Sequence, residues 1–342
     1  MSLRLCRESR SARALMGRVL RDGRDLGSEY PLVFGEQSAA TIVVDEQDGA
    51  VRSTCAILPR TLIAGRERIL IGMIGSVATD PHWRNRGLAG RVLSAAEREL
   101  QARGAVLAIL WADDARFYER RGWRFFGCEV DAVLKPGIMP NLPAAKGVRP
   151  MQPHDAAAVH ELYLQHRARV DRSLEETRLL LACPGMEVLI CEDGVDVLAY
   201  ACLGRGGDME NVVHEWGGDP RAVGMILRRL IELRRTCGIE DDLYVMLPCA
   251  TDGLLRLLFD AGATLAKGVL GMGKILDEAA ARAALARALG TDQDVMLSGA
   301  ELLDAWLPPR GDKAVRQRLA QQLGLTEASS APAPFIWGLD SI

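Results

Sequence analysis

Residues 76–90 have the composition of an anion-binding turn. An apolar segment predicted as a strand leads into Arg-x-x-Gly-x-Ala-Gly, and an amphipathic segment predicted as a helix follows at once. Gly87 has no Cβ and Ala89 has only a methyl group, so a ligand can approach the main chain closely. Unpaired N–H groups at a helix start and the positive end of the helix dipole favour a phosphate group. Arg84 and Arg86 add positive charge, so the sequence predicts a pyrophosphate site.

Two common phosphate-binding loops do not fit this segment. A nucleoside-triphosphatase loop requires Gly-Lys-Ser/Thr after its glycines, whereas Gly90 is followed by Arg91 and Val92. A dinucleotide-binding loop requires Gly-x-Gly-x-x-Gly and an acidic residue about 20 positions later. The segment has only Gly87 and Gly90, so it is expected to bind a different phosphate-containing ligand.

Two motifs resemble signatures of the GNAT superfamily of acyl-CoA-dependent N-acyltransferases. The acyl-CoA loop of that family is similar to Val77-x-Thr79-x-Pro81-x-x-Arg84-x-x-Gly87-x-Ala89. One predicted helix and one predicted strand later comes the second motif, Phe117-Tyr118-Glu119-Arg120-x-Gly122-Trp123. For the first motif alone, an ordinary strand–loop–helix connection is the alternative. By this resemblance the CoA-binding residues are Val77, Ala78, Thr79, Arg84, Asn85, Arg86, Gly87, Leu88, Ala89 and Gly90.

Tyr118 is the candidate general acid. Acyl transfer from a thioester to an amine releases a thiolate whose conjugate thiol has a pKa of roughly 8.5, and this thiolate must gain a proton. A phenol with an ordinary pKa of about 10 carries its proton at neutral pH. The resemblance implies the same role for Tyr118, and it implies that a backbone N–H near Val77 stabilises the oxyanion. Without its motif, a tyrosine on an amphipathic helix would be a core residue.

The general base is not evident, because residues 71–77, where many relatives have a glutamate, contain no ionisable side chain. Three alternatives stay open: a chain of water molecules, a carboxylate of Glu36, Asp113 or Asp114, or the terminal carboxylate of Ile342. The last follows from a looser resemblance to the Eis (enhanced intracellular survival) type of acetyltransferase. Those proteins carry two tandem GNAT-like domains and a C-terminal region whose end enters the active site.

The composition is typical of a globular protein with no nucleic-acid or membrane partner. The chain has 342 residues, enough for two domains, of which 49% are hydrophobic and 25% charged. A net charge of −3 gives no reason to expect nucleic acid as a partner. No apolar run approaches the ~20 residues that span a bilayer. We therefore expect a cytoplasmic protein, and the sequence leaves homo-oligomerisation open.

The eight cysteines are scattered through apolar segments, with no Cys-x-x-Cys pair and no histidine cluster. This pattern is typical of small core residues in a reducing cytosol. We therefore expect neither a metal site nor a disulfide.

We expect an α/β (α+β) fold of two tandem GNAT-like domains, each a mixed, mostly antiparallel sheet flanked by helices, with a short helical C-terminal region. The catalytic GNAT domain is assigned to residues 1–135. Its predicted elements are a helix at 11–21, a hairpin at 39–44 and 51–58, a strand at 69–77, a helix at 87–103, a strand at 105–111, a short helix that Asp113 or Asp114 caps and Gly122 closes, and one or two strands at 123–134. The arginines before Asp22 are similar to a transit peptide, but a short strand and the first helix of the domain are favoured.

A linker rich in proline and glycine is assigned to residues 136–147, and a degenerate GNAT-like domain to 148–277. The order of elements starts again there, but the loop after Pro220 lacks Arg-x-x-Gly-x-Gly/Ala. We therefore expect no CoA in this domain. The helical C-terminal region, residues 278–342, is predicted to contain helices at 278–289 and 313–323 and an apolar tail docked in a groove.

The sequence thus predicts an acetyl-CoA-dependent N-acetyltransferase without a metal. Its acceptor is a small-molecule or peptide amine, and attack is direct, because no Cys-His or Ser-His arrangement favours a covalent intermediate. The alternative is a non-catalytic acyl-CoA-binding or regulatory protein.

Overall fold

The computed structural model describes residues 2–24, 26–36, 38–207, 209–249, 253–289, 294–297, 299–306, 321 and 335–342. These residues form two compact units, each discontinuous in sequence. Unit 1 contains the chain up to Gly127, the described residues between Leu270 and Pro334, and Ser341–Ile342. Unit 2 contains Cys128–Val269 and Phe335–Asp340.

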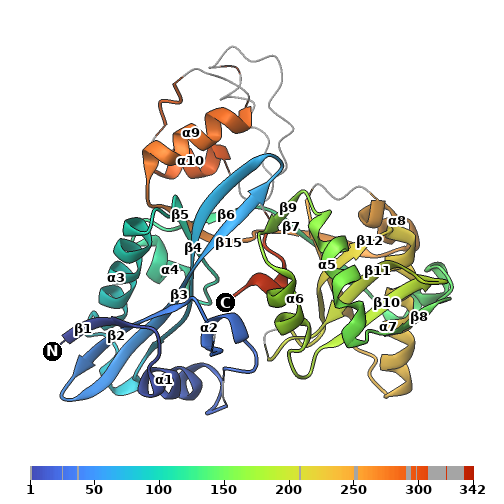
Figure 1. The fold of residues 1–342 in the computed structure, drawn as a ribbon, viewed down its shortest axis with the longest axis horizontal. Coiled ribbons are helices and arrows are strands. Elements are labelled where there is room, and N and C mark those ends of the chain that lie inside the picture. Colours follow the sequence, from blue (N-terminus) through green and yellow to red (C-terminus); the bar gives the residue numbers. More distant parts are fainter. Residues whose placement is uncertain are drawn as a thin grey trace. The chain divides into compact units, whose positions relative to one another are not determined.

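Unit 1 is built on a sheet with the strand order β1-β2-β3-β4-β5-β15-β6. Its strands are β1 (Ser2–Cys6), β2 (Thr41–Gln47), β3 (Ala50–Ala64), β4 (Glu67–Thr79), β5 (Leu107–Leu110), β6 (Arg124–Phe126) and β15 (Gly271–Ile275). The pair β4–β5 is parallel, and the other neighbours in this order are antiparallel. Its helices, labelled in Figure 1, are α1 (Arg10–Leu20), α2 (Pro31–Phe34), α3 (Leu88–Ala102), α4 (Ala115–Glu119), α9 (Glu278–Leu289) and α10 (Gly299–Trp306).

Both faces of the sheet in unit 1 are buried. Successive side chains along a strand point to opposite sides, so each strand contributes residues to both faces. One face forms a core cluster with α3. Its buried strand residues are Val43, Cys55, Ile57, Ile74, Ala108, Leu110 and Met272. The other face forms a cluster with α1. Its buried strand residues are Ile42, Val44, Val51, Ala56, Leu58 and Ala78. These α3-side and α1-side clusters define the two sides of the sheet on which the site residues are placed below.

Unit 2 repeats this plan with the strand order β14-β7-β13-β12-β11-β10-β8. Its strands are β7 (Glu129–Leu134), β8 (Val148–Pro150), β10 (Glu187–Asp193), β11 (Asp196–Leu203), β12 (Val212–Gly218), β13 (Leu243–Pro248) and β14 (Thr264–Gly268), with a further short strand β9 (Ala168–Val170). Its α-helices are α5 (Ala156–Leu164), α6 (Leu174–Leu181), α7 (Pro220–Thr236) and α8 (Gly253–Ala261). The pair β12–β13 is parallel, as β4–β5 is in unit 1.

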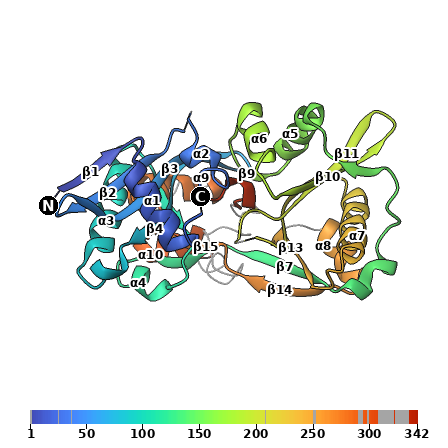
Figure 2. The same ribbon diagram turned by 90° about the horizontal axis from the view of Figure 1, so that it is seen from below.

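The two units exchange one strand each. In unit 1, β15 lies between β5 and β6, although it comes from the later part of the chain. In unit 2, β7 lies between β13 and β14, as Figure 2 shows. The predicted fold class is confirmed: both sheets are mixed, mostly antiparallel and flanked by helices. The predicted domains 1–135 and 148–277 are each one continuous stretch of sequence. In the structure, β7 from the first stretch belongs to unit 2, and β15 from the second stretch belongs to unit 1.

The expectation that the cysteines form no disulfide is wrong for one pair. Cys128 and Cys249 form a disulfide in unit 2, with Cα atoms 5.7 Å apart, although 121 residues separate them in sequence. The cause is the antiparallel pairing of β7 with β13, in which Glu129 lies opposite Pro248. Cys128 precedes Glu129 and Cys249 follows Pro248, so the pairing brings both cysteines to the same end of the β7–β13 pair. The spacing of cysteines along the chain contains no information on that pairing.

In the C-terminal region the predicted helix at 278–289 is α9. The apolar residues between the two predicted helices contribute to α10 (Gly299–Trp306), which the sequence analysis had not assigned as a helix. The predicted helix at 313–323 lies outside the described residues, apart from residue 321. The tail residues 335–340 are buried in unit 2.

Candidate active site

The predicted phosphate loop forms a turn that leads from β4 into α3. After Thr79 the chain makes the single 3-10 turn Pro81–Trp83, capped by the carboxylate of Asp80, which accepts a hydrogen bond from the His82 amide. Asn85 and Gly87 then adopt positive φ angles of 61° and 77°. Such left-handed residues fold successive N–H groups into a concave arrangement that suits an anion.

Among the described residues, no side chain caps the first amides of α3. Gly87 is the N-cap residue. The first backbone bond of the helix runs from Arg91 N–H to Gly87 C=O at 3.1 Å, so the N–H groups of Leu88, Ala89 and Gly90 precede the intrahelical ladder. No atom of the residues that the structure describes lies within 4 Å of the position that a Cβ at Gly87 would occupy. The turn is therefore open where a diphosphate would have to approach.

Arginines on neighbouring elements lie beside this turn. The ring of Trp83 stacks with Arg86 at 4.6 Å and with Arg52 at 4.8 Å from its centroid. Arg52 also forms an ion pair with Asp80 at 2.8 Å. Arg84 and Arg86 are both exposed. The stacking holds the Arg86 guanidinium, and a planar guanidinium is suited to bidentate contacts with phosphate oxygens.

Arg121, which the sequence analysis did not assign to the site, lies beside the first turn of α3. A Cβ added at Gly90 would lie 2.9 Å from Arg121 Nη2, which places this guanidinium over the first turn of α3. The side chain is held by a 2.7 Å hydrogen bond to the carbonyl of Phe117 and by stacking on that ring at 3.9 Å. The sequence signal was its place in the second motif, immediately before Gly122. The sequence does not show where the Arg121 side chain points, because its direction depends on the turn that follows α4.

The sheet of unit 1 opens beside the loop. Ile71–Met73 of β4 pair with Leu107–Ile109 of β5, but β4 continues to Thr79 beyond the last residue of that ladder. Backbone groups of β4 on this side are thus available to an extended ligand. Within the same stretch, the register of β3 and β4 shifts between Thr54 and Ala56, and Ser76 adopts a φ of 52°. This bulge returns Val77 to the α3 side, where it packs against that cluster.

Tyr118 lies on the α3 side of this opening. It packs in the α3-side cluster with 9% of its surface exposed, and its ring meets Phe117 and Trp123 edge to face. Burial, followed by the nearby thiol of Cys55, raises the pKa of Tyr118 to about 12. The hydroxyl is therefore protonated throughout the physiological pH range and is a hydrogen-bond donor.

Ile342 lies on the α1 side of the sheet at Gly75, the residue before the bulge. Gly75 pairs with Ala56, a member of the α1-side cluster, and the Ile342 side chain packs against the same cluster. A Cβ added at Gly75 would lie 2.5 Å from the backbone oxygen of Ile342 and 2.6 Å from its carbonyl carbon. Only glycine leaves room for this approach.

The other acidic residues considered as bases are on the surface. Glu36, Asp113 and Asp114 are all exposed. The carboxylate of Asp114 is engaged as the N-cap of α4, where it accepts a hydrogen bond from the Arg116 amide at 3.2 Å. Of the alternatives named from the sequence, Ile342 is thus the one that contacts the strand before the loop.

No group of His, Cys, Asp and Glu side chains in the described part of the chain is arranged to hold a metal ion. None of the described helices is both long and apolar enough to span a bilayer. The features that remain for chemistry in unit 1 are the open helix N-terminus, the divided sheet, the phenol of Tyr118 and the end of the chain at Gly75.

Comparison with known proteins places this site in a family. Residues 9–126 match the family described as Acetyltransferase (GNAT) domain. The chain has no match by sequence among curated proteins. Among solved structures, a GCN5-related N-acetyltransferase from Anabaena variabilis ATCC 29413 is 16% identical, with a TM-score of 0.69 and 100% of both chains covered.

Two further solved structures share the fold. A GCN5-related N-acetyltransferase from Kribbella flavida is 15% identical, with a TM-score of 0.64 and 100% of both chains covered. Eis1 from Mycobacterium abscessus is 16% identical with a TM-score of 0.55, and the match covers 83% of this chain and 76% of that one. At these identities the likeness concerns the fold.

The loop and the divided sheet both lie within the residues that match this acetyltransferase domain. The matched residues 9–126 lie within unit 1, so unit 1 contains a GNAT acetyltransferase domain.

Proposed function

We propose that unit 1 is a cytoplasmic N-acetyltransferase that moves an acetyl group from acetyl-CoA to the amine of a small molecule or a peptide. Attack by the amine is direct, within a ternary complex. The observation that carries the proposal is the opening of the sheet between β4 and β5 beyond Met73. It has a buried phenol on its α3 side and the end of the chain on its α1 side.

The residues of the loop fit the carrier. The N–H groups of Leu88, Ala89 and Gly90, the turn at Asn85 and Gly87, and the charges of Arg84 and Arg86 would hold the diphosphate. Arg121 would add a guanidinium beside the same helix turn. Val77, Ala78 and Thr79 would pair through their backbone with the pantetheine arm, because β5 does not reach them.

Tyr118 would donate a hydrogen bond to the sulfur as the carbon–sulfur bond breaks. Complete proton transfer from a phenol of pKa about 12 to a thiolate of pKa about 8.5 is uphill by roughly 3.5 units, or about 5 kcal/mol. Tyr118 therefore stabilises the developing thiolate as a donor, and the transfer is completed only as CoA leaves. The backbone N–H near Val77 would stabilise the oxyanion from the strand itself.

The terminal carboxylate of Ile342 would receive the proton of the attacking amine. A carboxylate attracts an ammonium group and can accept a hydrogen bond from the neutral amine as it attacks. Support comes from the approach of Ile342 to Gly75 and from the exposure of Glu36, Asp113 and Asp114. Acid and base would then lie on opposite sides of the sheet, with the thioester between them.

The test is release of free thiol from acetyl-CoA against a panel of amines. Tyr118→Phe should lower kcat by about 100-fold, the range expected for loss of a positioned acid, and should leave the Kd of CoA within about twofold. Tyr244→Phe, on an exposed residue of unit 2, is the matched control and should keep full turnover. Because Tyr118 titrates near pH 12, the wild-type rate should show no descending limb from this group between pH 7 and 10.

Each outcome decides between two functions. Turnover that depends on the Tyr118 hydroxyl supports the transferase. Full activity of Tyr118→Phe would reject Tyr118 as the donor. Tight CoA binding without turnover on any amine would favour a non-catalytic acyl-CoA-binding protein.

A further inference from the structure

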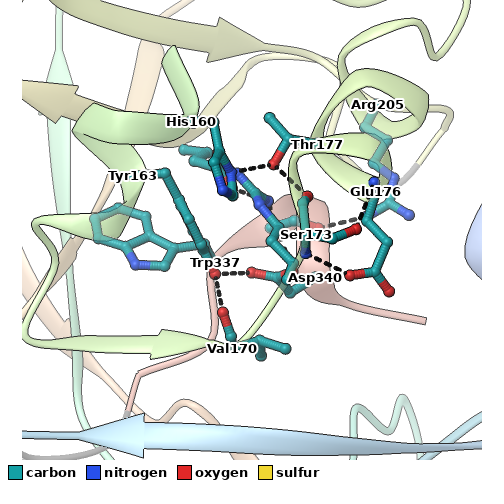
Figure 3. Close-up of polar contacts among 12 residues, drawn as sticks. His160, Tyr163, Val170, Ser173, Glu176, Thr177, Arg205, Trp337 and Asp340 are labelled. Atoms are coloured by element: carbon teal, nitrogen blue, oxygen red, sulfur yellow. Dashed lines mark hydrogen bonds and ion pairs between the residues drawn. The ribbon is translucent and has the colours of Figure 1, made fainter. Parts of the chain in front are cut away.

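Tyr118 of unit 1 differs from Tyr163 of unit 2 in what holds its hydroxyl group. The hydroxyl of Tyr163 lies 2.7 Å from each of two acceptors, the carbonyl of Val170 and Oδ2 of Asp340, as Figure 3 shows. Within the described part of the chain, by contrast, no residue forms a hydrogen bond with the Tyr118 hydroxyl. This group can therefore donate to a ligand, and its direction depends on how the ring is held.

The ring of Tyr118 is held by two aromatic neighbours on its own segment. Its centroid lies 4.9 Å from that of Phe117 and 6.1 Å from that of Trp123, with interplanar angles of 88° and 72°. The carbonyl of Tyr118 accepts hydrogen bonds from the N–H groups of Arg121 at 2.8 Å and Trp123 at 3.2 Å. Gly122, with a φ of 82°, lets the chain turn between them. This turn folds Trp123 back against Tyr118, so the position of the phenol depends on that of the indole.

Trp123 is in turn held by a polar contact with α3. It is 1% exposed, and its indole N–H donates to Oε1 of Glu97 at 2.8 Å. The other carboxylate oxygen of Glu97 forms an ion pair with Nζ of Lys274 on β15 at 2.7 Å. Both oxygens of this carboxylate are thus engaged. A buried indole N–H needs an acceptor, so the contact with Glu97 specifies where the indole lies.

The segment that carries Tyr118 contacts α3 at two places. The guanidinium of Arg121 lies over Gly90, and the indole of Trp123 is bonded to Glu97. Gly90 and Glu97 are seven residues apart, so they lie on the same face of α3, about 10 Å apart along its axis. One helix therefore carries both the turn proposed for the diphosphate and the carboxylate that supports the phenol. Because the diphosphate and the sulfur belong to one CoA molecule, a fixed spacing between turn and phenol helps to place the sulfur at the hydroxyl.

We infer that Glu97 is a positioning residue for Tyr118: oriented by Lys274, its carboxylate holds Trp123, and Trp123 directs the phenol toward the opening beside β4. This inference rests on the proposed role of Tyr118 as the donor to the sulfur. The side chains of Glu97 and Lys274 are 15% and 27% exposed, and an ion pair that is open to water adds little to stability. Its loss should therefore affect the reaction more than the fold. The strand β15 has a part in this support, because it supplies Lys274.

The experiment measures kcat and the KM for acetyl-CoA of whole-chain variants by thiol release. Glu97→Leu removes the acceptor of the indole N–H and should lower kcat by about tenfold, while the KM for acetyl-CoA and the Kd of CoA stay within about twofold. Glu97→Gln keeps an acceptor and should retain at least about a third of kcat, and Lys274→Met should lower kcat by about threefold. Glu99→Leu is the matched control and should keep full turnover, because Glu99 lies on the same helix and pairs with Arg103 at 2.7 Å.

The same variants in the Tyr118→Phe background separate positioning from a general structural role. If Glu97 acts through the Tyr118 hydroxyl, Glu97→Leu should cause no further loss of kcat in Tyr118→Phe, since the two effects are then not additive. If Glu97→Leu does not fold, Lys274→Met in the two backgrounds decides the same question. An equal loss in both backgrounds, or full turnover of Glu97→Leu, would overturn the positioning role and leave Tyr118 as the donor. Full turnover of Tyr118→Phe, or no turnover of the wild type on any amine, would overturn the proposed function and this inference with it.

Discussion

The two units begin their longest helices in opposite ways. In unit 1, α3 starts after Gly87 with no side-chain cap and with open space above the glycine. In unit 2, α7 starts with Pro220, and the carboxylate of Asp219 accepts a hydrogen bond from Ala222 N–H at 2.9 Å. A Cβ added at Gly218 would overlap the carbonyl oxygen of Leu198. The same strand–turn–helix plan thus leaves the first helix turn without a side-chain cap in one unit and caps it with a carboxylate in the other.

The strands that lead into these helices differ as well. β4 has no ionisable side chain between Ile71 and Val77, whereas β12 carries His214 and Glu215, both fully buried. Glu215 is used by Arg172 and Tyr200 and has no access to a substrate. The same strand position thus differs in chemistry between the units: in unit 2 its carboxylate is engaged in a buried ion pair, and in unit 1 the strand offers no carboxylate, so the proposed base has to come from another element.

The largest expected effect is the loss of CoA affinity when a side chain fills the open loop at Gly87. Gly87→Glu places a carboxylate in the space where the diphosphate would lie, so the affinity for CoA should fall by at least about 100-fold in isothermal titration calorimetry. Gly49→Glu is the matched control, because Gly49 has a similar φ of 73° against 77° and is also open within 4 Å. Equal CoA affinity in the two variants would reject the placement of the diphosphate at Gly87.

The buried His214 of unit 2 should make the free energy of unfolding depend on pH below neutrality. Burial lowers the pKa of His214 in unit 2 to about 3, and its Nε2 lies 3.1 Å from the carbonyl of Gly204. The unfolded chain binds a proton below pH 6.5 and the folded unit does not, so stability is complete above 6.5 and falls as the pH drops toward 3. Between pH 7 and 5 this group should remove about 2 kcal/mol from the free energy of unfolding.

The variant His214→Gln isolates that contribution, since its amide can still donate to Gly204. Urea unfolding followed by tryptophan fluorescence at the two pH values should show a smaller loss in the variant than in the wild type. An identical loss in both proteins would mean that His214 titrates normally in the folded state.

A smaller effect on CoA affinity is expected at the first turn of α3. Arg121→Ala removes the guanidinium beside Gly90 and should weaken CoA binding by about tenfold, the usual effect of losing one charge-assisted contact. Arg116→Ala, on the exposed side of α4, removes the same charge and should leave the affinity within about twofold. Calorimetry at low and high salt checks both, and equal losses would point to net charge alone.

The smallest effect concerns the closed loop of unit 2. Asp219→Ala removes the cap of α7 and should lower the free energy of unfolding by about 1 kcal/mol. It should not create a second site, so CoA should still bind with one equivalent per chain. Asp219→Asn keeps an acceptor for Ala222 N–H and should cost less. Two equivalents of CoA in Asp219→Ala would show that the side chain alone closes unit 2.

The sequence predicted those features whose cause is local. The start of α3 was expected at residue 87, and the helix begins at Leu88, because the change from turn to amphipathic pattern lies within a few residues. Tyr118 was expected on a short helix for the same reason, and α4 carries it. The loop geometry follows from Asn85 and Gly87, residue types that tolerate positive φ.

Features that depend on distant pairing were not predictable in this way. The pairing of Leu107 with Ile275, the disulfide between Cys128 and Cys249 and the approach of Ile342 to Gly75 all join remote parts of the chain. The apolar pattern of a strand predicts that the strand is buried, but it does not predict which strands pair with it. A single sequence therefore predicted many of the local elements, and it grouped β7 with the first domain and β15 with the second, whereas each pairs in the sheet of the other unit.

The strand exchange has a consequence for the synthesis of the protein. A ribosome releases β5 and β6 long before β15, which must insert between them, and at typical elongation rates the delay is on the order of ten seconds. During that time the nascent catalytic sheet has two unpaired edges, which are prone to wrong pairing. The enzyme can therefore mature only after nearly all of unit 2 has been translated, and shielding of the waiting edges by a chaperone would raise its yield.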